Sequence, residues 1–185
     1  ASASAVVNGE AVDTSMGLTP LEGLVMGTRT GDIDPAAVFH LMRNGGMKID
    51  EIDTLFNKRS GLKGLTGDND MRSVRARANA GDKEARLALD VVLHRLVKYV
   101  GAYAAEMGGL DVLTFTAGIG ENDSALRQEL CDKLKMFGIT LDPVANVLRS
   151  KDPRTISASD SKVRVMVVPT NEELAIAQQA MSLLD

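Results

Sequence analysis

The hydrophobic pattern of the chain changes its period once between residues 111 and 137. Residues 112–116, VLTFT, form a short apolar and β-branched run with the length of a strand. The apolar residues that follow recur at helical spacing, at Leu126, Leu130, Leu134 and Phe137. Between them, residues 117–123 carry two glycines, and Asn122 or Asp123 can cap the helix. The pattern predicts a strand, a ligand-accessible loop and a helix.

The same order of patterns returns near the end of the chain. Residues 163–168 form an apolar run of strand length, and residues 169–173, PTNEE, lead into a helix. One face of that helix carries Leu174, Ala177, Met181 and Leu184. Thr170 and Glu173 fit a capping box, which leaves Glu172 free to face the space beyond the strand. Because ligands of open α/β sheets lie beyond the carboxyl ends of strands, the two units predict an α/β protein with a small-molecule site.

Turn and cap signatures divide the rest of the chain. Asn8-Gly9 suits the positive φ angles of a two-residue turn, which predicts a hairpin over residues 1–15. Helices are predicted over residues 19–27, which begin with Thr19-Pro20, and over residues 34–44, 49–60 and 82–107. Residues 61–70 are expected to form a glycine-rich loop, and residues 142–162 an irregular excursion with at most a short strand at 155–157.

Composition narrows the class of protein. The chain has 185 residues, 44% of them hydrophobic, which suits one domain over residues 1–185. Its net charge of −4 comes from interspersed charges without a basic stripe, so nucleic acid is not an expected partner. The one cysteine, Cys131, excludes a disulfide framework and is expected to be buried and inert. No apolar run is long enough to span a membrane and no signal peptide begins the chain, so we expect a cytoplasmic protein.

The residue pattern alone leaves the site chemistry open. Gly118-x-Gly120 is typical of a nucleotide site, but it is equally typical of tight packing between strand and helix. Asp123 stands where a Rossmann dinucleotide fingerprint needs glycine or alanine, which disfavours that class. Arg29, in a loop bracketed by Gly27 and Gly31, is either a solvated surface charge or a planar fork for phosphate or carboxylate.

Two further groups have a structural and a functional interpretation. Glu172 is either a carboxylate that complements the helix dipole or a ligand of Mg²⁺, which favours one or two carboxylates plus phosphates and waters. Asp70, Met71 and Arg72 begin an arginine-rich segment that residue physics alone predicts to be an exposed, capped helix.

Four stretches resemble signatures of the acetate kinase family, in that family's order. Residues 13–35, DTSMGLTPLEGLVMGTRTGDIDP, resemble its long signature, and residues 115–122, FTAGIGEN, its adenosine motif. Residues 70–72 resemble its second nucleotide segment and residues 169–173 its metal-binding end. The resemblance extends over essentially all 185 residues but only to the C-terminal half of such a kinase.

The resemblance implies a ribonuclease H-like domain of the actin-like ATPase and acetate and sugar kinase superfamily, with a mixed sheet flanked by helices. It implies reversible phosphoryl transfer between ATP and acetate to give ADP and acetyl phosphate, with Mg²⁺, or Mn²⁺ as an alternative ion, in a homodimer. By motif, Arg29 would stabilise the transferring phosphoryl group, and Glu172 would bind the metal. The nucleotide would be held by Asp70, Met71, Arg72, Gly118, Ile119, Gly120, Glu121 and Asn122.

The chain departs from the family in what it lacks. The N-terminal half of the family, with a substrate arginine, a catalytic aspartate and a phosphate-binding loop, does not precede Ala1. We therefore expect a fragment or cleaved product that binds nucleotide but does not transfer phosphate alone. Because carboxylate specificity resides in the missing half, a propionate or other short-chain carboxylate kinase stays open. A non-catalytic dimerisation module is the alternative for the isolated chain.

Overall fold

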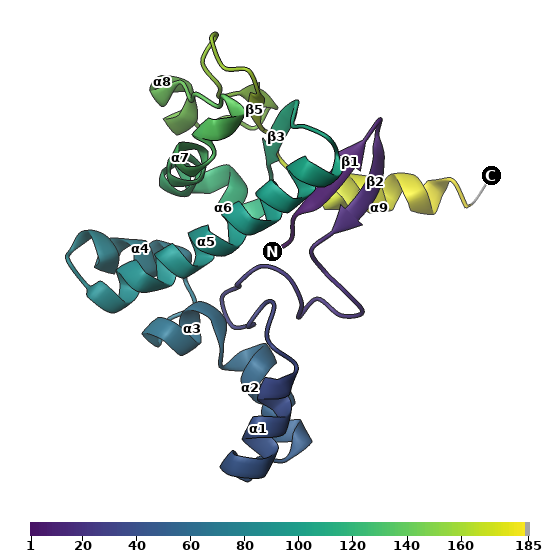
Figure 1. Cartoon of the computed structure of the whole chain (residues 1–185). Helices are drawn as coiled ribbons and strands as arrows, with labels where there is room; N and C mark the ends of the chain where they lie inside the picture. The colour runs from purple at the N-terminus through teal and green to yellow at the C-terminus, as the bar shows by residue number, and fades with distance from the viewer. Residues whose placement is uncertain (184–185) are drawn as a thin grey trace. The chain divides into compact units, whose positions relative to one another are not determined.

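A computed structural model of the chain describes residues 1–183 and divides the chain into two compact units, Ala1–Gly109 and Leu110–Asp185. Figure 1 shows the helices and strands of both units. The expectation of one domain over residues 1–185 stays a prediction.

The first unit opens with a hairpin and continues as helices. Strands β1 (Ser4–Val7) and β2 (Glu10–Thr14) pair antiparallel. Asn8 and Gly9 both have positive φ, 53° and 87°, so the predicted turn is confirmed. The helices are α1 (Ala36–Gly45), α2 (Ile49–Lys58), α3 (Gly61–Thr66), α4 (Met71–Asn79) and α5 (Lys83–Glu106).

The core of the first unit lies where α3 and α4 pack against α5 (Figure 1). Its buried side chains come from the three helices: Leu62, Met71, Val74, Ala85, Ala88, Leu89 and Val92. The spacing of the apolar residues of α5 is the reason, because residues three or four apart share one helix face. The long helix is thus confirmed, with Asp82 as its N-cap.

The second unit contains the sheet. Its elements are β3 (Val112–Phe115), α6 (Ala117–Asn122), α7 (Ser124–Lys133), the 3₁₀ turn Lys135–Phe137, α8 (Pro143–Val147), β4 (Arg154–Thr155), β5 (Arg164–Val167) and α9 (Glu172–Met181). The strand order is β3-β5-β4, with β5 parallel to β3 and antiparallel to β4. The predicted mixed sheet with helices is confirmed.

Alternation along β5 and periodicity along α7 produce the buried positions of this unit. Val163, Val165 and Val167 are buried, as a strand with one covered face requires. On the helical side the predicted residues Leu126, Leu130 and Leu134 are buried, and so is Cys131. The predicted burial of Cys131 is confirmed, and this burial raises the pKa of its thiol to about 12.

Four local predictions are wrong. Residues 19–27 form turns and bends instead of a helix, because their backbone groups bond to distant parts of the chain. The glycine-rich segments expected as loops contain the short helices α3 and α6. Within the expected excursion, Asp142 caps the unpredicted helix α8, whose first residue is Pro143.

The start of α9 also differs from the expectation. Asn171 is the N-cap and accepts a bond from the Leu174 N–H at 3.1 Å, so the capping box of Thr170 and Glu173 is wrong. Leu174, Ala177 and Met181, which share one face of α9, are exposed. Leu184, predicted on the same face, lies outside the described residues.

Among residues 1–183, no helix combines the length and the apolar character needed to cross a bilayer.

Candidate functional site

The carboxyl ends of β3 and β5 lie side by side in the second unit. The two strands are parallel neighbours, and the Val168 N–H just after β5 donates to the Phe115 carbonyl at the end of β3, at 2.9 Å. The chain then enters α6 after β3 and α9 after β5 (Figure 1). Residues 118–122 and Glu172 are therefore delivered to the same edge of the sheet, which is where ligands of α/β sheets bind.

Glu121 connects these two segments. Its Oε1 accepts hydrogen bonds from the Thr170 N–H at 3.0 Å and from the Thr170 hydroxyl at 3.4 Å. The Glu121 carboxylate therefore joins α6 to the approach to α9. Asn122 is likewise used locally, because its Nδ2 donates to the Gly118 carbonyl at 2.9 Å.

The two glycines of α6 are explained differently. A Cβ on Gly120 would lie 3.3 Å from the Phe115 carbonyl carbon, so packing of α6 on the strand accounts for this glycine. A Cβ on Gly118 would meet nothing within 4 Å. Gly118 and the exposed Ile119 thus leave an open surface against which a ligand can lie.

A buried arginine that sequence analysis missed holds α6 in place. The Arg127 guanidinium donates to the carbonyls of Gly120 and Glu121, at 2.7 and 2.9 Å, and to both oxygens of Asn146. Arg127 is 2% exposed and Asn146 3%. Burial lowers the pKa of the guanidinium, and its four acceptors offset the cost of placing a cation there.

Glu172 is the first residue of α9 and is exposed. No hydrogen bond or ion pair of its carboxylate occurs within residues 1–183. In the same range, no three metal-binding side chains gather into one cluster. Glu172 thus suits an ion that takes one carboxylate together with phosphates and waters.

Arg29 lies in the first unit, in a loop whose backbone is fixed. Its carbonyl accepts from the Met26 N–H at 3.2 Å, and its Nη1 lies 4.0 Å from the Met26 sulfur. No carboxylate of the described residues pairs with the guanidinium. The planar donor fork is therefore available to an anion.

Asp70 and Arg72 form a capped helix start, as residue physics predicted. The Asp70 carboxylate accepts from the Arg72 N–H at 2.9 Å and pairs with its guanidinium at 2.6 Å. These bonds lower the pKa of Asp70 to about 2, so its carboxylate stays ionised at neutral pH. In contrast to the side chains of Asp70 and Arg72, the Met71 side chain belongs to the core, so only the backbone of Met71 can face a ligand.

The loops of Arg29 and Asp70 adjoin. A Cβ on Gly27 would lie 3.0 Å from the Asn69 carbonyl oxygen, so the two backbones meet next to both candidate segments. The structure therefore brings Arg29 and residues 70–72 together in the first unit, and residues 118–122 and Glu172 together in the second.

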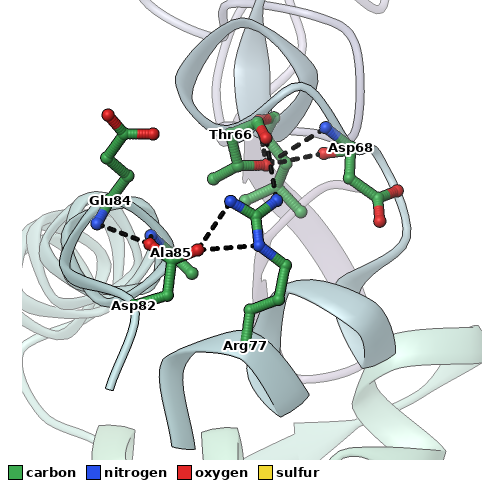
Figure 2. A network of polar contacts seen from close by, with 7 residues as sticks. Thr66, Asp68, Arg77, Asp82, Glu84 and Ala85 are labelled. Carbon is green, nitrogen blue, oxygen red and sulfur yellow. Dashed lines mark hydrogen bonds and ion pairs between the residues drawn. The ribbon is translucent and has the colours of Figure 1, made fainter. Parts of the chain in front are cut away.

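A polar network fixes the turn that precedes Asp70 (Figure 2). Arg77 donates to the Thr66 carbonyl at 2.8 Å and pairs with Asp82 at 2.7 Å, while Asp82 caps α5. The Thr66 hydroxyl accepts from the Asp68 N–H at 3.2 Å, and Asp68 in turn accepts from the Asp70 N–H at 2.9 Å. The ends of three helices are thereby tied to the candidate nucleotide segment.

The mixed sheet and the two helix starts at its carboxyl edge define the class of protein. This arrangement is that of the acetate and sugar kinase branch of the actin-like, ribonuclease H-like superfamily, and solved acetate kinases share it. The model of the Acetokinase family matches residues 1–178, and the chain belongs to that family.

The relatives agree in sequence and in structure. The chain is 63% identical to the acetate kinase of Leifsonia xyli over 98% of its own length and 46% of that protein. The crystal structure of Porphyromonas gingivalis acetate kinase superposes with a TM-score of 0.92 at 45% identity, covering 100% of this chain and 46% of that one. A propionate kinase from Francisella tularensis gives a TM-score of 0.89 at 45% identity, over 96% and 45%. The chain thus spans about half the length of the relatives it matches.

Proposed function

We propose that the chain is the nucleotide-side half of an acetate kinase, which transfers phosphate reversibly between ATP and acetate. The main observation in support is the junction of α6 with the start of α9 at the carboxyl edge of the sheet. There the Glu121–Thr170 bonds hold the open surface of Gly118 next to the start of α9. Family membership supports the reaction, and the junction supports the proposal that the nucleotide and its metal bind there.

The proposed roles follow from what each group can do. Phosphoryl transfer depends on positioning and charge neutralisation, which a free guanidinium such as that of Arg29 provides. Residues 118–122 offer an open backbone to the adenosine, and Asp70 and Arg72 offer an exposed, mutually aligned pair. Met71 would contribute through its backbone.

Glu172 would hold the divalent ion, Mg²⁺ in this proposal and Mn²⁺ as the alternative. Its exposed and unshared carboxylate fits an ion that keeps several waters and takes its other ligands from substrate phosphates. When bound, the ion neutralises charge on the phosphate oxygens. A homodimer, a cytoplasmic location and an N-terminal half that completes the cleft belong to the same proposal.

A propionate kinase is the second candidate. The Francisella structure of that description is as similar in identity, 45%, as the Porphyromonas acetate kinase. In the proposal, the groups that select the carboxylate lie in the other half of the enzyme, which explains why this half resembles both.

The test is acyl phosphate formation by the full-length kinase that carries this chain, with ATP, Mg²⁺ and either acetate or propionate. The proposal expects acetyl phosphate, with a higher kcat/KM for acetate than for propionate. A higher kcat/KM for propionate would replace the first candidate by the second. Absence of acyl phosphate with either acid would refute both.

A further inference from the structure

The loop that carries Arg29 is closed at its base. The Asp32 N–H donates to the Gly23 carbonyl at 2.9 Å, and the Gly23 N–H donates to the Asp32 carboxylate at 2.8 Å. Gly31 has a φ of +69°, and a Cβ there would lie 2.5 Å from the Gly23 carbonyl oxygen. The base can therefore close only with glycine at position 31, and Arg29 lies inside the closed loop.

Two side chains of α5 hold this base. The Asp32 carboxylate pairs with Arg95 Nη1 at 3.0 Å and accepts from the Tyr99 hydroxyl at 2.9 Å. Arg95 also donates to the Gly23 carbonyl at 2.9 Å, so it binds both ends of the loop. The side chains of Arg95 and Asp32 are 19% and 33% exposed, which makes this pair less accessible to water and salt than a surface ion pair.

The residues on either side of Arg29 are held by a second element. The Thr30 N–H donates to the Phe56 carbonyl at 3.1 Å, and the Thr28 hydroxyl donates to the Asn57 carbonyl at 2.9 Å, both at the end of α2. The backbone of Arg29 is thus fixed on both sides. Its guanidinium has only the Met26 sulfur at 4.0 Å as a polar contact among the described residues.

A fixed backbone with an available guanidinium is the arrangement that transition-state stabilisation needs. A donor must already lie where charge develops, and a displacement of about 1 Å can cost on the order of 10² in rate. A surface arginine needs no such support, because solvated side chains adopt many rotamers.

We propose that Asp32, held by Arg95 and Tyr99, is a positioning residue that sets the place of the Arg29 guanidinium during phosphoryl transfer. The inference rests on the proposed function, because Arg29 acts there. Asp32 does not touch the nucleotide in this account. It acts through the loop it closes.

The first test is Asp32→Asn in the full-length kinase, since asparagine keeps the size but loses the charge that pairs with Arg95. We expect kcat to fall about 10- to 100-fold while the KM for ATP changes less than about threefold. Asp90→Asn is the matched control, because Asp90 forms another α5 ion pair, with Arg86 at 2.6 Å, that does not touch the loop. Its kcat should equal that of the wild type.

The second test is a double-mutant cycle, which a merely structural role would not satisfy. In an Arg29→Ala background, Asp32→Asn should lower kcat less than twofold further, because the group it positions is gone. If Asp32→Asn does not fold, Tyr99→Phe, which removes one hydroxyl, takes its place in the same cycle.

The outcomes separate the two proposals. If the losses of kcat caused by Arg29→Ala and Asp32→Asn multiply in the double mutant, or if Asp32→Asn keeps the wild-type kcat, the positioning role is overturned. Either result would leave the role of Arg29 intact. Near-normal turnover of Arg29→Ala would overturn the role of Arg29 itself, and the positioning role with it.

Discussion

Replacement of Arg127 by methionine tests whether the buried guanidinium fixes the candidate adenosine segment. The side chain joins three helices, because it lies on α7, bonds to the last carbonyls of α6 and bonds to Asn146 of α8. Methionine has a similar length and fills the space without any donor. The substitution therefore removes the hydrogen bonds and leaves most of the packing.

The expected loss of stability in Arg127→Met follows from the hydrogen-bond acceptors that lose their donor. The two oxygens of Asn146 are buried, and an unsatisfied buried acceptor costs about 1–3 kcal/mol. The carbonyls of Gly120 and Glu121 are half-buried and can bond to water. Removal of a buried cation offsets part of the loss, so we expect a destabilisation of about 3 kcal/mol.

Hydrogen exchange followed by mass spectrometry measures this change segment by segment. A loss of about 3 kcal/mol corresponds to roughly 100-fold faster exchange in α6 and α8, if exchange occurs through opening of this unit. Arg149→Met is the control, because Arg149 is exposed in the same unit. Equal exchange rates in Arg127→Met and Arg149→Met would refute the assignment of Arg127 as the group that holds α6.

Three further predictions concern single side chains. Arg29→Ala in the full-length kinase should lower kcat by about 10²- to 10³-fold and leave the KM for ATP near normal, whereas the exposed Arg43→Ala should change neither. Equal kcat and KM values in the two variants would identify Arg29 as a surface charge. Glu172→Gln should raise the Mg²⁺ concentration for half-maximal activity, and Glu173→Gln should not, because only Glu172 is proposed to bind the ion; equal shifts would contradict that choice. Native Cys131 should resist a thiol reagent at pH 8, where a pKa of about 12 leaves about one thiolate in ten thousand; rapid native labelling would show that the thiol is accessible.

The elements predicted correctly are those whose pattern is decided locally. Asn8-Gly9 determines its own turn, and the stripe of α5 needs only one buried face. The change of period after residue 116 likewise depends on neighbouring residues, so β3 and α7 were predictable.

Two of the wrong predictions, those for residues 19–27 and for α3, have a common physical cause, which is bonding over long sequence distances. Thr19-Pro20 is a sound helix start, but the Gly23 carbonyl is taken by Arg95 and by the Asp32 N–H instead of a helical N–H. Glycines made α3 and α6 look like loops, since glycine costs about 1 kcal/mol in a helix interior. Here the Gly120 carbonyl is held by Arg127, and the Leu62 N–H of α3 by the Met26 carbonyl.

Of the candidate site, the sequence predicted the segments but not what supports them. Arg127 was missed because a charged residue within a helix is usually solvated. Its spacing of four from Cys131 and seven from Leu134 places it on their face, and this was the available signal. Asp32 is far in the sequence from Arg95 and Tyr99, which lie one turn apart on α5, so only the folded chain shows that Asp32 meets them.

Calorimetric titration of the purified chain with adenosine, ADP and Mg·ATP, beside an acetyl phosphate assay, tests the central claim most directly. If the chain is the nucleotide-side half, adenosine and Mg·ATP should bind with affinities within about threefold, because most charge-assisted phosphate bonds lie outside it. Gly118→Val should abolish binding without loss of stability, since its side chain would enter open space. No acetyl phosphate should form. Failure of the folded chain to bind adenosine, or robust acetyl phosphate production by the chain alone, would contradict the account.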